Sequence, residues 1–178
     1  MTAAPATTVP AGSSGGQAVA NSVVSVTLIS GWSKDSSSTS TSLALVGPDG
    51  LSAVFSTQQV SPSDTLSDIF DKQISNFESD SNFQDVSVCS EPQSGGVPGT
   101  PAISGGGAEI CFTGSTQSGG AQLWAALVFD GLVPGSAGGN QLLVTELAFT
   151  PQSNSEAVVG QELKPVLQSA RWLQVSSS

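Results

Sequence analysis

The sequence contains no histidine and no tyrosine, and only 4 of its 178 residues are lysine or arginine. Histidine is the commonest general base in enzymes and the commonest metal ligand in proteins. Its absence excludes Ser/His/Asp and Cys/His catalytic groups. We therefore predict that this protein is not an enzyme and that it has no metal ion and no cofactor.

Basic residues are outnumbered by 14 acids, which gives a formal net charge of -10 and an isoelectric point near 4.1. A field of this sign repels phosphate backbones and anionic lipid headgroups, so we expect no nucleic acid partner. The sequence also has no run of about 18 apolar residues, and we expect no direct membrane insertion. Cationic, neutral and apolar partners remain open.

Only two cysteines are present, Cys89 and Cys111, and they flank a stretch rich in glycine and proline at 94–101. An even cysteine count in a chain rich in Ser, Thr and Gly favours an oxidising compartment, where one disulfide would close this loop. Such a disulfide stabilises a fold by roughly 3 kcal/mol. The alternative is a pair of unbonded core thiols in a cytosolic protein.

The first 22 residues carry no charge and consist mostly of Ala, Thr, Pro, Gly and Ser. This composition predicts a flexible tether over 1–22, followed by a single domain over 23–175. A tether in front of an exported domain usually follows a signal peptide, a lipid anchor or a membrane helix. We therefore expect an extracytoplasmic protein, secreted or tethered to the cell envelope, whose native export signal or anchor precedes residue 1. An ordinary frayed terminus is the other interpretation.

Alternating apolar residues predict several strands. The first covers about 23–29, and the turn Gly47-Pro48-Asp49-Gly50 joins two more in a hairpin. Short strands are expected to enter Cys89 and to surround Cys111, with a glycine-rich loop between them. The segments 121–129 and 141–150 are apolar on both faces, which is typical of central strands.

Two segments have helical periodicity. Ser61, with Pro62 behind it, predicts the start of a helix over about 62–78. A capping box at Ser153–Glu156 predicts a second helix to about 170. The order of strands and helices predicts an α+β fold, with an antiparallel sheet of about six or seven strands and two main helices packed on it.

Two short motifs carry a resemblance to a known family. Ser30-Gly31-Trp32 closes the first strand, and Leu167-Gln168-Ser169-Ala170-Arg171-Trp172 closes the last helix. In this arrangement the chain resembles the PsbP-like superfamily over 23–175, closest to the LpqN-type envelope lipoproteins of actinobacteria. The resemblance implies a PsbP-like fold and a role in binding partners. The lipobox cysteine of such lipoproteins is missing from this sequence.

Three residues are candidates for functional roles. Trp32, at a strand end beside Gly31, is a candidate for partner binding, although a core position fits it as well. Glu109 and Glu146 interrupt apolar strands, and buried carboxyl groups of this kind can act as proton donors. The structural alternative is that each points to solvent at a strand end, or that one pairs with Arg171.

These observations favour a non-catalytic, extracytoplasmic binding or adaptor domain of the cell envelope. Its partner would be an envelope protein or a lipid-like small molecule. An apolar cavity between sheet and helix would favour the small molecule, and a flat exposed apolar patch would favour the protein. The alternatives are a carboxylate-dependent hydrolase that uses Glu109 and Glu146 and a purely structural surface protein, which the Ser/Gly/Thr bias suggests.

Overall fold

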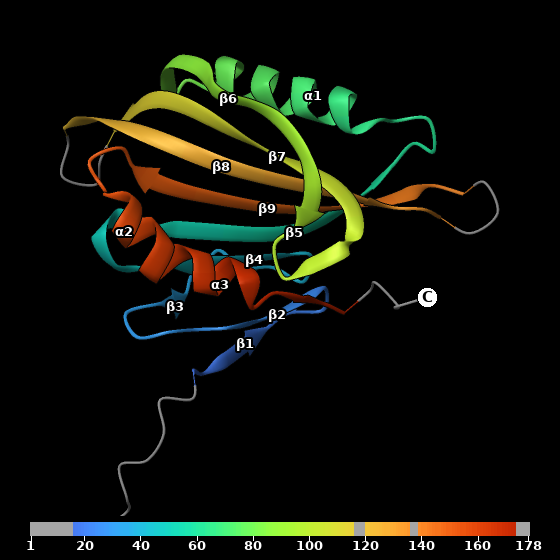
Figure 1. The fold of residues 1–178 in the computed structure, drawn as a ribbon, viewed down its shortest axis with the longest axis horizontal. Coiled ribbons are helices and arrows are strands. Elements are labelled where there is room, and N and C mark those ends of the chain that lie inside the picture. Colours follow the sequence, from blue (N-terminus) through green and yellow to red (C-terminus); the bar gives the residue numbers. More distant parts are fainter. Residues whose placement is uncertain (1–15, 116–119, 136–138, 174–178) are drawn as a thin grey trace, which may run out of the picture.

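The computed structural model describes residues 16–115, 120–135 and 139–173, which form an α+β fold built on two antiparallel sheets (Figure 1). In spatial order, the strands of the large sheet are β3 (Ser33–Lys34), β4 (Ser42–Val46), β5 (Ser52–Val60), β9 (Gln141–Pro151), β8 (Ala121–Val133), β7 (Thr100–Ser115) and β6 (Phe83–Val97). The small sheet consists of β1 (Ala18–Ala20), β2 (Val24–Thr27) and β10 (Arg171–Trp172). The predicted fold class is confirmed.

Helices cover both faces of the large sheet. Helix α1 (Leu66–Ser79) lies on one face, over β6, β7 and β8. The opposite face carries a C-terminal helical segment and the small sheet (Figure 1). This segment consists of α2 (Glu156–Val158), a π-helical turn (Val159–Leu163) and α3 (Lys164–Gln168). The sheet therefore separates two hydrophobic cores.

The two cores differ in composition. The α1 core is rich in aromatic rings, and its buried members are Phe70, Phe77, Ala108, Ile110, Phe112, Ala126 and Val128. The opposite core is larger and mostly aliphatic, and it joins β2, β4, β5, β9 and the C-terminal helical segment. Strands β8 and β9 contribute to both cores, as their two apolar faces predicted.

Helix α1 begins later than the sequence predicted. Its N-cap is Thr65, whose hydroxyl accepts a hydrogen bond from the Asp68 amide while the Asp68 carboxylate accepts one from the Thr65 amide. Ser61 instead opens a turn in which the Asp64 amide donates to the Ser61 carbonyl over 3.1 Å. The prediction of Ser61 as N-cap was wrong because Thr65 offers the complete reciprocal cap. The second helix likewise begins after Ser155 and not after Ser153.

The glycine-rich segment after Cys89 is strand and not loop. Strands β6 and β7 continue through it, with Gly95 opposite Gly105, and the chain reverses at Gly99, whose φ is +75°. On β7, glycine is needed at position 107 because the neighbouring strand β8 leaves no room for a side chain. A Cβ at Gly107 would lie 2.7 Å from Cδ1 of Phe129. The prediction of a loop was wrong because glycines in a strand can also mark a close approach of neighbouring backbones.

The N-terminal boundary of the fold lies upstream of residue 23. Strand β1 pairs with β2, and the Leu28 amide donates to the Gln17 carbonyl over 2.8 Å. The last residues of the predicted tether are thus part of the small sheet, while residues 1–15 lie outside the described ones. None of the helices in the described ranges is long and apolar enough to cross a membrane.

The predicted disulfide between Cys89 and Cys111 is present, and it joins β6 to β7. The two Cα atoms are 5.7 Å apart. Cys89 lies within an irregularity of the register, between Val88, which pairs with Ile110, and Ser90, which pairs with Glu109. The bond therefore fastens the irregular edge strand β6 to the more regular part of the sheet.

Reduction of this disulfide should lower the free energy of unfolding by about 3 kcal/mol, because the unfolded chain regains the entropy of an open 22-residue loop. Urea unfolding with and without dithiothreitol measures the change. The variant with both cysteines replaced by alanine should match the reduced protein. Equal midpoints for oxidised and reduced protein would contradict the expectation.

Candidate functional site

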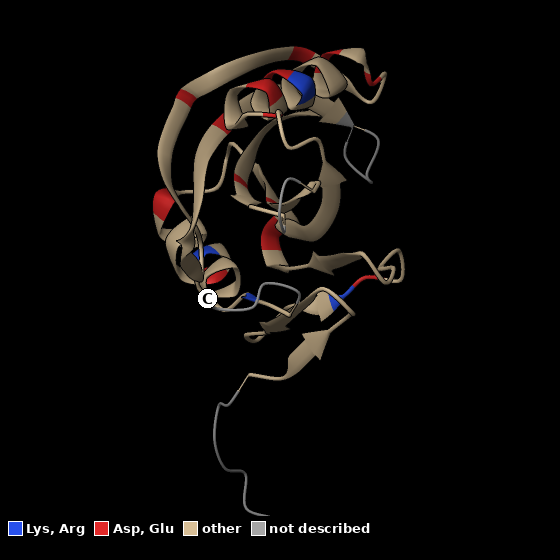
Figure 2. Cartoon of the chain, turned by 90° about the vertical axis from the view of Figure 1, so that its right-hand side faces the viewer, with Lys and Arg blue, Asp and Glu red and all other residues tan. Residues whose placement is uncertain are grey.

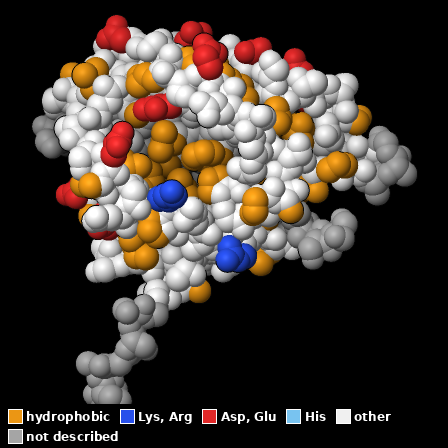
Figure 3. Space-filling view, in the orientation of Figure 1, with side chains coloured by type: hydrophobic (Ala, Val, Ile, Leu, Met, Phe, Trp, Pro, Cys, Tyr) orange, Lys and Arg blue, Asp and Glu red, His pale blue; other side chains and the backbone are white. Residues whose placement is uncertain are grey.

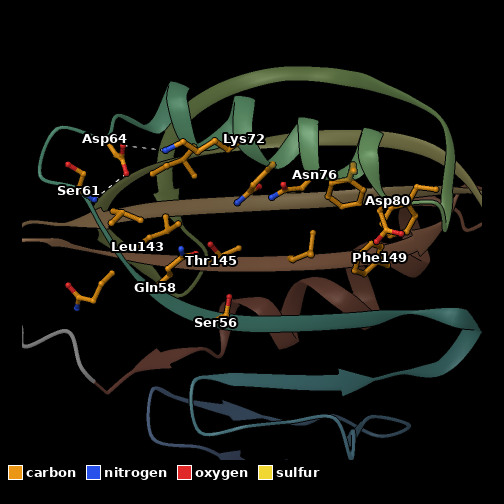
Figure 4. A pocket seen from close by; sticks show the side chains of 17 residues that line it. Ser56, Gln58, Ser61, Asp64, Lys72, Asn76, Asp80, Leu143, Thr145 and Phe149 are labelled. Carbon is orange, nitrogen blue, oxygen red and sulfur yellow. Dashed lines mark hydrogen bonds and ion pairs between the residues drawn. The ribbon is translucent and has the colours of Figure 1, made fainter.

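A groove with a volume of about 670 Å³ lies between α1 and the strands β5 and β9. It exists because α1 rests on β6, β7 and β8 through its buried residues Ile69, Phe70 and Phe77 and leaves β5 and β9 uncovered on this face. We call this hollow the α1 groove. Figure 4 shows the α1 residues Lys72 and Asn76 above it and the strand residues below.

The floor of the α1 groove is polar but uncharged along most of its length. Ser56 and Gln58 of β5 stand opposite Thr145 and Leu143 of β9. At one end, Asp64 and Lys72 form an ion pair of 3.3 Å (Figure 4). The groove therefore offers hydrogen-bond donors and acceptors without a net charge at this end.

The other end of the α1 groove is aromatic. Phe149 lies there beside Asp80 (Figure 4), and Phe77 and Phe83 complete the lining. The Phe77 ring is 4.9 Å from that of Phe83 and 6.2 Å from that of Phe149, measured between centroids. A second hollow of about 270 Å³, lined by Phe112 and Trp124 among others, adjoins it through Phe83 and Phe149. The aromatic end therefore suits an apolar chain.

The loop before α1 is held in place from the floor. The side-chain amide of Gln141 donates to the carbonyl oxygens of Ser61 and Asp64, each over 3.1 Å. Because Gln141 begins β9, this pair of bonds fixes the N-terminal end of α1 relative to the sheet. The width of the polar end of the groove is set by these contacts.

A buried acid lies beneath the α1 groove. Asp130 of β8 is 0% exposed, and its Oδ1 accepts hydrogen bonds from Thr145 Oγ1 at 2.6 Å and from Gln73 Nε2 at 3.0 Å. Both donors also line the groove. Burial raises the pKa of Asp130 to about 6, against the effect of these two hydrogen bonds, which favour the charged form.

An apolar pocket of about 280 Å³ lies on the opposite face, between β8 and the C-terminal helical segment. Leu127, Phe129, Val159, Leu163 and Leu167 line it, with Pro98, Lys164 and Gln168 around them. Val159 and Leu163 are the ends of the π-helical turn, a distortion that is frequent at functional sites. Figure 3 shows a hollow on this side with hydrophobic side chains inside it and a basic side chain beside it.

Glu109 and Glu146 lie on strands that are not neighbours in the sheet. Glu109 lies on β7 and Glu146 on β9, so that β8 separates them, and the strand spacing and rise place their Cα atoms on the order of 12 Å apart. Glu109 is half-buried and Glu146 is fully buried, where no substrate in solution reaches it. The geometry gives the hydrolase hypothesis no support.

Glu146 is fully buried, whereas the structural alternative placed it at a strand end facing solvent or paired with Arg171. Arg171 does not pair with it; its guanidinium donates to the carbonyl oxygens of Ala170 and Gln168 at the end of α3. Neither carboxyl oxygen of Glu146 has a hydrogen-bond partner among the described residues. Burial raises the pKa of Glu146 to about 9, and the nearby Trp172 indole, outside hydrogen-bond geometry, lowers it only in part.

Trp32 lies in the core. Its side chain is 7% exposed and belongs to the aliphatic core below the sheet. A Cβ on Gly47 would lie 2.5 Å from the Trp32 ring, so the hairpin between β4 and β5 packs directly on the indole. This burial does not favour the role of Trp32 as an exposed binding anchor, and the role stays a prediction.

Charge is spread over the surface, as Figure 2 shows. Acidic residues are scattered over α1 and the strands, and the few basic residues do not gather. None of the described segments brings three or more potential metal ligands together. The α1 groove is therefore distinguished by its shape and hydrogen-bonding groups and not by a charged patch.

Sequence reasoning missed the residues that build the α1 groove. Gln73, Asp130 and Thr145 are polar side chains on three different elements, and only the tertiary fold brings them together. Asp130 had one usable signal, because it follows nine residues of a strand that is apolar on both faces.

Comparison with known proteins identifies the fold. The sequence matches no protein-family model and no curated protein. The structure is similar to that of LpqN from Mycobacterium tuberculosis, involved in cell envelope biogenesis, with 10% identity, a TM-score of 0.53 and coverage of 88% of this chain and 84% of LpqN. The Saccharomyces cerevisiae Ran-binding protein Mog1p matches with 10% identity, a TM-score of 0.46 and coverage of 84% of this chain and 90% of Mog1p. The resemblance to LpqN-type proteins therefore holds at the level of the fold.

Replacement of the buried acid, Glu146→Gln, should flatten the pH dependence of stability. The folded-state pKa of about 9 lies above the ordinary 4.5, so the contribution of Glu146 to stability is complete below pH 4.5 and is lost as the pH rises towards 9. Between pH 5 and pH 7 the wild type should lose on the order of 3 kcal/mol that the glutamine variant keeps.

Urea unfolding at several pH values measures this difference. Glu109→Gln is the matched control, because that side chain is half-exposed, and it should reproduce the wild-type slope. The same slope in Glu146→Gln and wild type would show that the buried carboxyl does not govern the pH dependence.

Proposed function

We propose that this chain is a non-catalytic binding domain of the cell envelope, outside the cytoplasm, and that its α1 groove holds a lipid-like molecule with a single apolar chain and a head without net charge. The observation that carries the proposal is the groove itself, about 670 Å³ in volume, with an aromatic end and an uncharged polar floor. Volumes in this range are typical of small-molecule sites.

The two ends of the groove indicate how such a molecule would lie. The apolar chain would contact Phe77, Phe83 and Phe149, where burial of apolar surface favours binding. The head would face Gln58 and the ion pair of Asp64 and Lys72 at the other end. A head with a net negative charge would meet the field of a chain of net charge -10.

The exposed surface supports a small molecule more than a flat protein contact. The large hydrophobic side chains that are exposed in the described part of the chain are Val46, Val88, Leu123 and Leu173, each on a different segment. Docking surfaces for proteins usually gather such side chains into one patch. An envelope protein as partner remains the second outcome of the binding test below.

Two findings support a place outside the cytoplasm. Disulfides such as Cys89–Cys111 form and persist mainly in oxidising compartments. The similar LpqN structure comes from a protein involved in cell envelope biogenesis. The complete burial of Glu146 keeps one of the two candidate acids away from a substrate and favours a role in binding.

Filling the groove should abolish binding of a test lipid. The Ser56→Phe variant places a ring on the groove floor, and we expect at least a tenfold weaker Kd for lysophosphatidylcholine with a twelve-carbon chain, below its micellar concentration. Isothermal titration calorimetry gives the Kd, and thermal unfolding shows whether each variant is folded.

Two variants serve as controls for this experiment. Ser75→Phe adds the same ring on the exposed side of α1 and should bind like the wild type. Leu127→Trp fills the apolar pocket on the opposite face. If Leu127→Trp abolishes binding and Ser56→Phe does not, the ligand site lies in that pocket; no binding to the wild type would leave an envelope protein as the partner to be tested.

A thiol count on the native protein tests the compartment. We expect no free thiol before reduction and two afterwards, because Cys89 and Cys111 are the only cysteines in the sequence. Alkylation in the presence and absence of reductant, followed by mass spectrometry, gives the count. Two free thiols in protein kept from air would contradict an extracytoplasmic location.

A further inference from the structure

Two buried oxygen atoms beside the α1 groove have no hydrogen-bond partner. They are Oδ2 of Asp130 and Oε1 of Gln73. They belong to side chains already bonded to each other, since Gln73 Nε2 donates to Asp130 Oδ1 over 3.0 Å. An unpaired buried oxygen costs about 1–3 kcal/mol, so two of them on one contact require an explanation.

A proton on Asp130 Oδ2 would give both of these oxygen atoms a hydrogen-bond partner. A carboxylic acid and a primary amide can form two hydrogen bonds side by side: the amide N–H donates to one carboxyl oxygen, and the carboxyl O–H donates to the amide oxygen. The first of these bonds is present between Gln73 and Asp130. The partners of the second are the two unpaired oxygens. When Asp130 is ionised both are acceptors, and they repel each other.

We propose that Asp130 is a positioning residue that regulates the α1 groove through a proton: protonated, it forms a two-bond acid–amide pair with Gln73 that closes α1 onto the sheet, and ionised, it opens this contact to water. The inference rests on the proposed function, because it concerns the same groove. Gln73 bonds Asp130 and also lines the groove, so a change in the protonation of Asp130 changes the groove wall through Gln73.

No charged or titratable side chain among the described residues faces Asp130. From α1 it is faced by Gln73, from β9 by Thr145 and from β7 by Gly106, none of which titrates. Glu146 projects from the opposite face of the sheet. Asp64 and Lys72 pair with each other at the end of the groove, and Asp80 lies at the other end. The pKa of Asp130 is accordingly set by burial and by its two hydrogen bonds, without a charged neighbour.

The proton changes what the groove can hold. Gln73 and Thr145 line the groove and also bond Asp130, so an ionised carboxylate draws water to the groove floor. An apolar chain in the groove excludes that water and therefore binds the protonated form better. By linkage, ligand binding takes up a proton, and the affinity falls as the pH rises above about 6.

The experiment measures the Kd of the twelve-carbon lysophosphatidylcholine at pH 5 and pH 8, where its own charge does not change. We expect binding to be at least tenfold weaker at pH 8 for the wild type. Asp130→Asn should bind equally at both pH values and like the wild type at pH 5, because the asparagine amide presents an N–H to Gln73 Oε1 at every pH. The matched control is Asp71→Asn, which removes an exposed carboxylate from α1 outside the groove lining and should keep the wild-type pH dependence.

A wild-type Kd that is the same at pH 5 and pH 8 would overturn the proposal. So would an Asp130→Asn variant that retains the wild-type pH dependence, or an Asp71→Asn variant that loses it. Thermal unfolding at both pH values confirms that each variant is folded during the titration.

A second measurement separates this inference from the proposed function. In the ligand-free protein, the NMR signals of the Gln73 side-chain amide should shift with a midpoint near pH 6, and the shift should be missing in Asp130→Asn. If the lipid does not bind at any pH but these signals titrate, the proposed ligand is wrong and the acid–amide pair stands. If the lipid binds but the Gln73 signals do not respond to pH, the pair is refuted and the groove remains a lipid site.

Discussion

The structure depends on two neighbouring strands, β8 and β9, being buried on both faces at once. Helix α1 covers one side of these strands, the C-terminal helical segment and the small sheet cover the other, and the two hydrophobic cores are the result. A 14-residue helix is too narrow to cover the whole upper face. The α1 groove is the part of that face that remains, and its uncharged polar floor is the consequence of partial exposure to water.

The same double burial accounts for the two unusual acids. Asp130 and Glu146 lie on the paired strands β8 and β9 but face opposite cores. The first has two hydrogen-bond donors and lies next to an open groove, whereas the second has none and lies in the aliphatic core. A buried carboxyl without partners is kept neutral at a cost to stability, while one with partners beside water can change its charge in place.

The sequence was sufficient for the fold class and for several local features. Alternation of apolar residues located the strands, and the Gly47–Gly50 turn and the Cys89–Cys111 bond were predicted from residue types alone. It was insufficient where tertiary contacts decide. The glycine-rich stretch indicated a loop because the packing of the β7 glycines against β8 cannot be read locally. The burial of Trp32 and Glu146 depends on the cores that form around them. The groove residues come from separate elements, so their spacing in the sequence does not predict that they lie together.

The edges of the large sheet bear on how this protein behaves in a crowded compartment. At one edge β3 is two residues long and ends in Lys34. At the other, β6 contains Pro92 and several irregularities in its pairing with β7, where the disulfide holds it. A strand from another molecule needs a flat row of free backbone groups to add itself to a sheet. Neither edge provides such a row, so copies concentrated side by side would resist joining into a continuous β-structure.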